Sequence, residues 1–341
     1  MGECCAPQIG AHGPYCSPFT KGGQEAKVVS LCLLFLEPEE CVLNRGILYG
    51  AGAYLMWGFF PIYFKALHQV PALEIMFHRV VWSFLFLLLL VVVKRDWYSF
   101  RSNLSDRKLL LIYAVVAIFL SMNWLIYIYG VNAGQVVETS LGYFITPLAS
   151  VALGIFFLRE RLRPLQWLPV TLAVIGVAYL TWQYGSLPWI ALGLAFTFSM
   201  YGLLKKIAPL GSFQGLTLET ALLFLPGIAY LLFIEGQGKA AFGHAGAGTS
   251  LLLAFTGVIT ALPLLLFGSA ARQIPLTMIG LLQYMAPTVQ FLLGVLLYHE
   301  PFDTPRLVGF SIIWVALVIF WVENWWHVSR STPSQSALDA A

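Results

Sequence analysis

Long apolar runs, separated by short polar segments, make up most of this chain. A helix needs roughly 20 mostly apolar residues to cross the hydrocarbon core of a membrane. Proline and glycine are tolerated in such helices, because neighbouring helices satisfy the backbone groups that these residues free. Ten segments qualify, near residues 46–66, 73–93, 108–130, 135–158, 164–183, 187–206, 215–235, 250–271, 275–298 and 305–325. The pattern therefore predicts an all-α integral membrane protein with ten transmembrane helices.

Composition leads to the same class. Hydrophobic residues make up 59% of the 341 residues and charged residues only 10%, whereas soluble domains carry about 25% charged residues. The net charge is +3, and Lys and Arg occur in short clusters between the apolar runs. This distribution is typical of a protein whose partner is the lipid bilayer, and it does not favour nucleic acid.

The charges in the loops predict an orientation. With the N-terminus inside, four of the 19 Lys and Arg residues fall outside (Lys65, Arg79, Lys239 and Arg306) and the other 15 inside. Positive charge in short loops marks the cytoplasmic side. We therefore expect both termini to be cytoplasmic.

An internal repeat divides the ten helices into two sets of five. At a constant offset of 140 residues, "SLGYFITPLASVALGIFFLRE" (140–160) aligns with "GLLQYMAPTVQFLLGVLLYHE" (280–300). The matched positions include the pairs Pro147/Pro287, Gly154/Gly294 and Glu160/Glu300. The first and sixth helices match more weakly, with Trp57-Gly58 opposite Tyr201-Gly202.

Five is an odd number, so the half at 186–326 must enter the membrane upside down relative to the half at 45–185. Inverted repeats are typical of secondary transporters, which hold their substrate near the interface between the repeats. A channel or a membrane enzyme can also carry a duplication. The sequence contains no HExxH, G-x-S-x-G or Walker pattern, so it lacks the enzyme signatures that these motifs provide. We favour a transporter of a small molecule, not an enzyme, and keep a channel as the alternative.

The two ends of the chain lie outside both repeats. Residues 1–44 hold all five cysteines, at spacings that indicate neither a metal site nor a disulfide framework. We expect this segment to be a poorly ordered extension or the product of an upstream start codon. Residues 327–341 are expected to form a disordered tail. No cofactor is indicated.

Several stretches resemble a known family: "WGFFPIYFKAL", "PALEIMFHRVVWS", "NWLIYIYGVN", "ETSLGYFITPL", "GSLPWIALGLAFTFSMYGLLKK" and "QYMAPT". They are similar to the RarD branch of the EamA drug/metabolite transporter superfamily, over residues 50 to about 325. The resemblance implies a ten-helix basket with a central cavity and alternating access in the bacterial inner membrane. It also implies a small organic metabolite or drug as the substrate; RarD-type proteins are usually labelled chloramphenicol-sensitive, and their physiological substrate is generally left open.

Ionisable residues inside membrane spans are costly and mark candidate functional sites. Lys65, Glu74, Arg79 and Glu138 all belong to the predicted outer half, and they include two residues of each sign. We expect them to form a charge network that opens and closes an outer gate; the alternative is an interfacial cluster that only holds helix ends together. His78, one turn after Glu74, is a further candidate, with plain packing as its alternative.

Other candidates lie deeper or further along the chain. The residues expected to bind substrate or form the gate are, besides those above, Trp57, Asn123, Trp124, Tyr127, Tyr143 and Tyr284. Glu219 has no cation near it in the sequence and is the candidate for proton coupling, while sodium or the substrate gradient remain options. Arg272 fits a cytoplasmic anchor as well as a substrate contact. Pro147 and Pro287 are candidate hinges, with helix packing as the alternative. The GxxxG spacing in "GILYG" (46–50) leaves a homodimer open.

Overall fold

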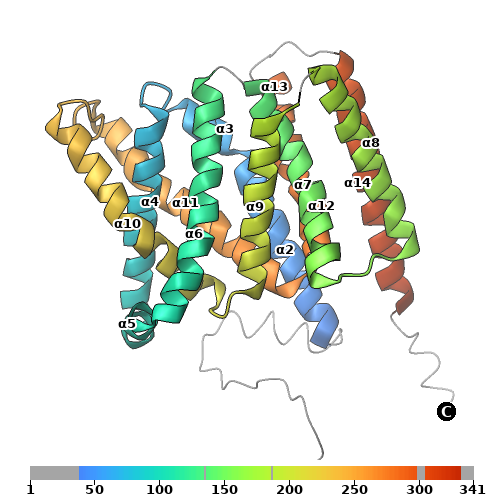
Figure 1. The fold of residues 1–341 in the computed structure, drawn as a ribbon, viewed down its shortest axis with the longest axis horizontal. Helices are drawn as coiled ribbons and strands as arrows, with labels where there is room; N and C mark the ends of the chain where they lie inside the picture. The colour runs from blue at the N-terminus through green and yellow to red at the C-terminus, as the bar shows by residue number, and fades with distance from the viewer. Residues whose placement is uncertain (1–37, 134–135, 186, 298–303, 332–341) are drawn as a thin grey trace, which may run out of the picture. The chain divides into compact units, whose positions relative to one another are not determined.

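The computed structural model describes residues 38–133, 136–185, 187–297 and 304–331. The elements in these ranges are helices (Figure 1), and no strand occurs among them. The contacts discussed below lie within the compact unit Leu43–Ala341. Eight of the described helices are long and apolar enough to cross a membrane. The chain is therefore an integral membrane protein of the predicted all-α class.

Most predicted segments coincide with a helix to within a few residues. These helices are α4 (Ala72–Val93), α6 (Arg107–Asn132), α7 (Val136–Leu158), α8 (Trp167–Tyr184), α9 (Trp189–Ile207), α10 (Ser212–Gly236) and α11 (Ala247–Gln273). A 3₁₀ turn, η1 (Pro164–Gln166), precedes α8. Local chemistry sets several boundaries. Asp106 Oδ1 accepts hydrogen bonds from the N–H groups of Lys108 (2.8 Å) and Leu109 (3.3 Å) at the start of α6, as an N-capping residue does.

Two predicted segments are each two helices rather than one. The segment 46–66 is α2 (Pro38–Gly58) followed by α3 (Phe60–Lys65), and 275–298 is α12 (Leu276–Gln283) followed by α13 (Met285–Leu296). Pro61 and Pro287 lie in the first turns of α3 and α13. Proline has no N–H and its ring clashes with the carbonyl four residues earlier, which interrupts a helix. Yet α7 continues through Pro147, so a proline alone does not decide where a helix breaks.

The structure also differs from the predictions in the loops and at the ends. Helix α5 (Trp97–Ser105) occupies a segment predicted as a loop. Helix α2 begins at Pro38, inside the predicted extension 1–44. Helix α14 (Thr304–Ser331) continues five residues past 326, where we predicted the disordered tail to begin. Residues 1–37 and 332–341 lie outside the described part of the chain.

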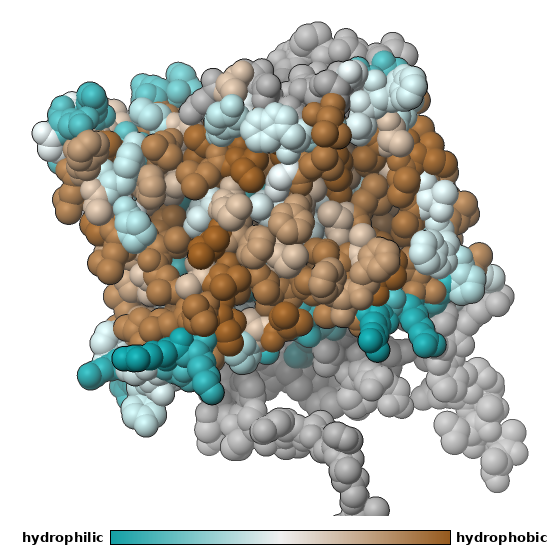
Figure 2. Space-filling model, viewed as in Figure 1, coloured by the Kyte–Doolittle hydropathy of each residue, from teal (hydrophilic) through white to brown (hydrophobic). Residues whose placement is uncertain are grey.

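Hydrophobic side chains cover the middle of the visible face, and hydrophilic ones gather at the ends of the helices (Figure 2). Large apolar side chains such as Leu111, Phe156 and Leu225 are 70%, 78% and 72% exposed, as expected of residues that face lipid. One end, which we call the basic end, collects the Lys and Arg residues at the end of α4, the start of α6, and the ends of α7, α9 and α11. These residues are Lys94, Arg95, Arg101, Arg107, Lys108, Arg159, Arg161, Arg163, Lys205, Lys206 and Arg272.

Small residues let the helices approach closely. Helix α4 packs against α10 and α11, α7 against α9 and α12, and α8 against α14. A Cβ on Gly257 of α11 would lie 2.3 Å from the carbonyl carbon of Trp82 in α4, and Ser83 Oγ donates a hydrogen bond to Gly257 O (3.1 Å). Burial of apolar surface contributes little free energy to helix association in lipid, so close packing of this kind contributes much of that free energy.

The glycines of the GxxxG motif are used in the same way within the chain. A Cβ on Gly46 would lie 2.4 Å from Ile274 Cγ2, and one on Gly50 would lie 2.9 Å from Leu282 Cδ1. The motif therefore packs α2 against residues 274–282 and gives no support to a homodimer.

Gly257→Ala should lower the thermal unfolding midpoint of the protein in detergent. The added methyl group meets the backbone of Trp82, which cannot rotate away, and such overpacking costs about 1–3 kcal/mol. The control is Gly248→Ala, also in α11, where a Cβ meets no atom within 4 Å; it should be neutral or slightly stabilising. Equal midpoints for the two variants would contradict this packing argument.

Candidate functional site

Arg79 lies at the centre of a cluster of residues from four helices. It lies in the third turn of α4, and its Nε donates a hydrogen bond to Thr260 Oγ1 of α11 (3.0 Å). Its Cζ lies over three aromatic rings, 4.8 Å from the centroid of Trp124 in α6, 5.3 Å from Phe64 and 5.9 Å from Phe60 in α3. Aromatic faces attract a cation and offset part of its loss of hydration. We call these five residues the Arg79 site.

Two tyrosines adjoin the Arg79 site. The rings of Tyr127 in α6 and Tyr143 in α7 contact edge to face, with centroids 6.2 Å apart. Both interact electrostatically with Arg79. Although they belong to helices within the bundle, they are 40% and 38% exposed. Two partly exposed tyrosine side chains therefore lie beside the Arg79 site.

Glu74 ties α4 to the segment between α10 and α11. Its Oε1 accepts hydrogen bonds from the N–H groups of Ala241 (2.7 Å) and Phe242 (3.4 Å). The side chain is only 1% exposed, and its Oε2 has no hydrogen-bond partner among the described residues. A buried carboxylate is expensive to desolvate, so these two amides account for much of its stabilisation.

His78 lies beside Glu74 and is held from both sides. Its Nδ1 accepts a hydrogen bond from Trp82 Nε1 (3.2 Å), and its Nε2 lies 3.7 Å from Glu74 Oε1. Indole N–H is only a donor, so Nδ1 must carry the lone pair and the neutral ring carries its proton on Nε2. The ring of Phe242 covers His78 at a centroid distance of 5.1 Å. Glu74 and His78 thus anchor the 241–242 segment onto α4.

A buried ion pair lies near the basic end. Lys205 Nζ of α9 is 2.7 Å from Glu219 Oε1 of α10, and the two side chains are 3% and 0% exposed. The Tyr201 hydroxyl donates to Glu219 Oε2 (3.3 Å). No cation lies near Glu219 in the sequence, but the fold brings Lys205, 14 residues earlier on α9, against it.

Similar proteins identify the family. The sequence profile of the EamA-like transporter family matches residues 44–182. Protein RarD of Streptomyces exfoliatus is 46% identical over 298 residues, which are 87% of this chain and 94% of that protein. The uncharacterized transporter YojE of Bacillus subtilis is 45% identical and covers 86% of this chain and 99% of its own. Protein RarD of Escherichia coli is 42% identical over 81% of this chain and 94% of its own.

The chain belongs to the EamA-like transporter family, among its RarD-type members. A solved crystal structure with 17% sequence identity shares the fold, with a TM-score of 0.62 over 85% of this chain and 99% of that one. The resemblance of the sequence motifs to the RarD branch is thereby confirmed.

Within this RarD-type chain, the gate network of Lys65, Glu74, Arg79 and Glu138 stays a prediction. Glu74 and Arg79 have the separate partners described above, and no ion pair among the described residues links either of them to Lys65. Lys65 lies exposed at the end of α3. The side chain of Glu138 lies outside the described part of the chain, so its pairing with Lys65 stays a prediction.

The predicted aromatic residues separate into three environments. Trp124, Tyr127 and Tyr143 gather around Arg79. Trp57 lies instead in an aromatic cluster that joins α2, α9 and α11, with ring centroids 5.4–6.2 Å apart. Its members are Tyr54, Trp57, Phe198, Tyr201 and Phe267. Tyr284 is 1% exposed, and its hydroxyl donates to Phe144 O of α7 (3.2 Å).

The remaining predicted residues make contacts between helices. Asn123 Nδ2 donates to Leu194 O and Thr197 Oγ1 of α9, both at 3.0 Å. Arg272 Nη1 donates to Ala208 O (2.6 Å) and Leu210 O (2.7 Å). These contacts hold the connection between α9 and α10, which matches the anchor interpretation of Arg272.

Sequence reasoning missed several members of these clusters. Phe60, Phe64 and Thr260 were not singled out, and Lys205 was assigned only to the cytoplasmic charge. The i, i+4 spacing of Phe60 and Phe64 puts them on one helix face, and this is the one signal that the sequence contained. Thr260 is 181 residues from Arg79, and no local pattern connects the two.

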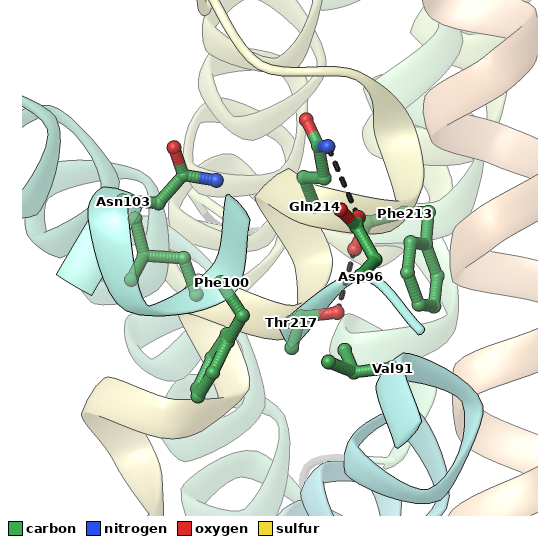
Figure 3. A pocket seen from close by; sticks show the side chains of 8 residues that line it. Val91, Asp96, Phe100, Asn103, Phe213, Gln214 and Thr217 are labelled. Carbon is green, nitrogen blue, oxygen red and sulfur yellow. Dashed lines mark hydrogen bonds between the residues drawn. The ribbon is translucent and has the colours of Figure 1, made fainter. Parts of the chain in front are cut away.

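A small pocket lies at the basic end, between α5, the end of α4 and the first turns of α10 (Figure 3). Gln214 Nε2 donates to Asp96 Oδ2 (3.2 Å) and Ser99 Oγ (3.0 Å) across it. Its wall residue Val91 lies about 18 Å along α4 from Arg79 at 1.5 Å per residue. The pocket is therefore separate from the Arg79 site, and its polar groups hold α5 against α10.

Replacing one member of the Lys205–Glu219 pair should destabilise the protein by about 3–5 kcal/mol, because the other charge is left buried and unpaired. We expect Lys205→Met and Glu219→Leu each to lower the unfolding midpoint in detergent, and the double variant to recover most of the loss. Additive losses in the double variant would show that the two residues are not energetically coupled.

Glu74→Ala should speed amide hydrogen exchange at Ala241 and Phe242 by about 10-fold or more, because hydrogen bonds to a charged acceptor contribute about 1.5–3 kcal/mol. The control is Glu235→Ala, which removes the exposed Glu235–His244 pair near the same segment and should have little effect. Exchange measured by mass spectrometry that is unchanged in Glu74→Ala would exclude this anchoring role.

Proposed function

We propose that this chain is a secondary transporter that moves a small organic metabolite or drug across the bacterial inner membrane by alternating access. One observation carries the proposal. A guanidinium group, Arg79, lies within a membrane span among aromatic rings and beside two partly exposed tyrosines. An ionisable residue at such a position is costly and is retained mainly for function.

The proposed fold has ten spans in two inverted repeats. Eight spans are given by helix length, and we assign the ninth to α12 with α13 and the tenth to α14. Pairs of close contacts support the repeat. A Cβ on Gly142 would lie 3.0 Å from Leu194 Cδ1, and one on Gly50 would lie 2.9 Å from Leu282 Cδ1. In the repeat alignment, Gly142 corresponds to Leu282 at an offset of 140 residues, and Gly50 corresponds to Leu194 at an offset of 144. The contact between Gly142 and Leu194 is therefore the repeat equivalent of the contact between Leu282 and Gly50.

The pair Phe144 and Tyr284 supports the same relation. The two positions are 140 residues apart, and the Tyr284 hydroxyl donates to Phe144 O. Equivalent residues meet each other only at an axis that relates the two halves. The inverted repeat therefore puts its axis at the crossing of α7 and α12.

The two halves differ in shape, as alternating access requires. Helix α7 is continuous through Pro147, while its counterpart is divided at Tyr284 just before Pro287. In inverted-repeat transporters one half moves against the other around the substrate. We propose that Pro287 is a hinge. If α7 became divided and α12 with α13 became continuous, the two halves would exchange conformations, and the site would open to the other side of the membrane.

The basic end carries the candidate closure. Glu160, just after α7 in the first proposed half, accepts hydrogen bonds from the N–H groups of Leu276 (2.7 Å) and Thr277 (2.9 Å) at the start of α12. Lys206 Nζ lies 3.7 Å from Glu160 Oε1 and donates to Ile274 O (2.6 Å). The contacts of Glu160 join the two halves, so they must break when this end opens, while the Lys206–Ile274 bond lies within the second half.

The charge distribution supports the proposed orientation. The basic end faces the cytoplasm under the positive-inside rule, which makes both termini cytoplasmic and puts Arg79 nearer the outer surface. Proton coupling is a separate part of the proposal, with Glu219 as its candidate group and the pair with Lys205 as the bond that protonation would break.

Proteoliposomes with the purified protein, loaded with a small-molecule extract of the source cells, test the function. We expect uptake of at least one labelled metabolite to saturate and to be accelerated by the same unlabelled metabolite inside. Counterflow of this kind requires a site that faces one side at a time. Flux that neither saturates nor shows counterflow would indicate a channel, and no flux above empty liposomes would contradict transport. An imposed pH gradient, with the Lys205→Met/Glu219→Leu double variant as comparison, tests the coupling.

A further inference from the structure

The Arg79 guanidinium has N–H donors without an acceptor among the described residues. A guanidinium carries five N–H donors in a fixed plane. Among the described residues, Nε bonds Thr260, and no hydrogen bond or ion pair uses Nη1 or Nη2. The rings of Trp124, Phe64 and Phe60 lie under or over Cζ. Because rings cover its faces, the open part of the group is its edge.

No carboxylate of the described residues balances this charge. Glu74, on the same helix, is bound to the amides of the 241–242 segment and lies beside His78. Glu219 is paired with Lys205. A cation inside a membrane span without an anionic partner is unfavourable, and aromatic faces compensate only part of that cost.

We propose that the Arg79 site binds the carboxylate of a small organic anion whose body is apolar or aromatic. The inference rests on the proposed transport function and specifies its substrate class. The two terminal nitrogens of Arg79 form the fork that matches a carboxylate with two parallel hydrogen bonds. Tyr127 and Tyr143 supply hydroxyl groups at the accessible side, and the Trp124 and Phe64 rings provide flat apolar surface for the rest of the molecule.

Thr260 is a positioning residue in this proposal. Its hydroxyl accepts from Nε, which fixes the plane of the guanidinium and thereby the direction of the fork. A purely structural Arg79 would hold α4 to α11 through the same bond, so binding as well as stability must be measured.

The test measures binding to the full chain in nanodiscs. The probes are hexanoate, benzoate, phenylacetate and indole-3-acetate, each compared with its own primary amide by thermal shift and tryptophan fluorescence. We expect at least one carboxylate to bind about 10- to 100-fold more tightly than its amide, the range that corresponds to a charged hydrogen-bonded pair. If every amide binds as well as its acid, or if none of the probes binds, the inference is wrong.

Variants of Arg79 and a control variant test whether the acids bind at the Arg79 site. Arg79→Gln should lose the preference for the acid, and Arg79→Lys should keep part of it, because an ammonium group offers a point charge without the fork. Arg101→Gln, an exposed residue of α5, should bind as the unaltered protein does. Acid binding that survives Arg79→Gln overturns the inference. If that variant does not fold, the comparison of acids with amides in the unaltered protein, together with Arg79→Lys, decides.

The outcome separates this inference from the proposed function. Counterflow of a neutral or cationic solute, with no preference for acids and no effect of Arg79→Lys, would support the proposed transport function and contradict the proposed anion site. Preferential binding of a carboxylate without counterflow of any solute would support the proposed anion site and contradict the proposed transport mechanism.

Discussion

A hydrocarbon surrounding offers no water to solvate charges, so every polar group that enters it must find a partner in the protein. This constraint explains the pairings described above. Lys205 and Glu219 neutralise each other at 2.7 Å, and Glu74 binds two backbone amides. Arg79 stands apart, since aromatic faces and one hydroxyl surround it and no described carboxylate does. Among the described residues, the charged group whose pairing is least complete is therefore the best candidate to meet a solute.

Close packing supplies the rigidity that this arrangement needs. Gly257 lets α11 lie directly on the backbone of α4, and Arg79 and Thr260 face each other across the same pair of helices. The position of the guanidinium thus depends on helices whose separation is set by a residue without a side chain. The two tyrosines and Arg79 come from the first proposed half, whereas Thr260 comes from α11 in the second, so the candidate site draws on both proposed halves.

The two ends of the bundle are held by the same kind of contact. At the basic end, Glu160 caps the first turn of α12 and lies near Lys206. Near the opposite end, Glu74 holds the segment that connects α10 to α11. In each case a carboxylate binds backbone N–H groups rather than a single lysine or arginine. Such contacts are specific in geometry, yet each depends on a few hydrogen bonds, which suits a contact that forms and breaks during a transport cycle.

The sequence by itself determined the helical class, most helix positions, the basic end and the family, because hydropathy and charge are local properties that act over about 20 residues. It did not determine which charges meet. Lys205 and Glu219 lie on different helices, 14 residues apart in the sequence, and Arg79 and Thr260 are 181 residues apart. Nor did it distinguish Pro147, inside a continuous helix, from Pro287, just after a break. These features depend on how neighbouring helices pack, since the partner that satisfies a freed or charged group comes from a distant part of the chain.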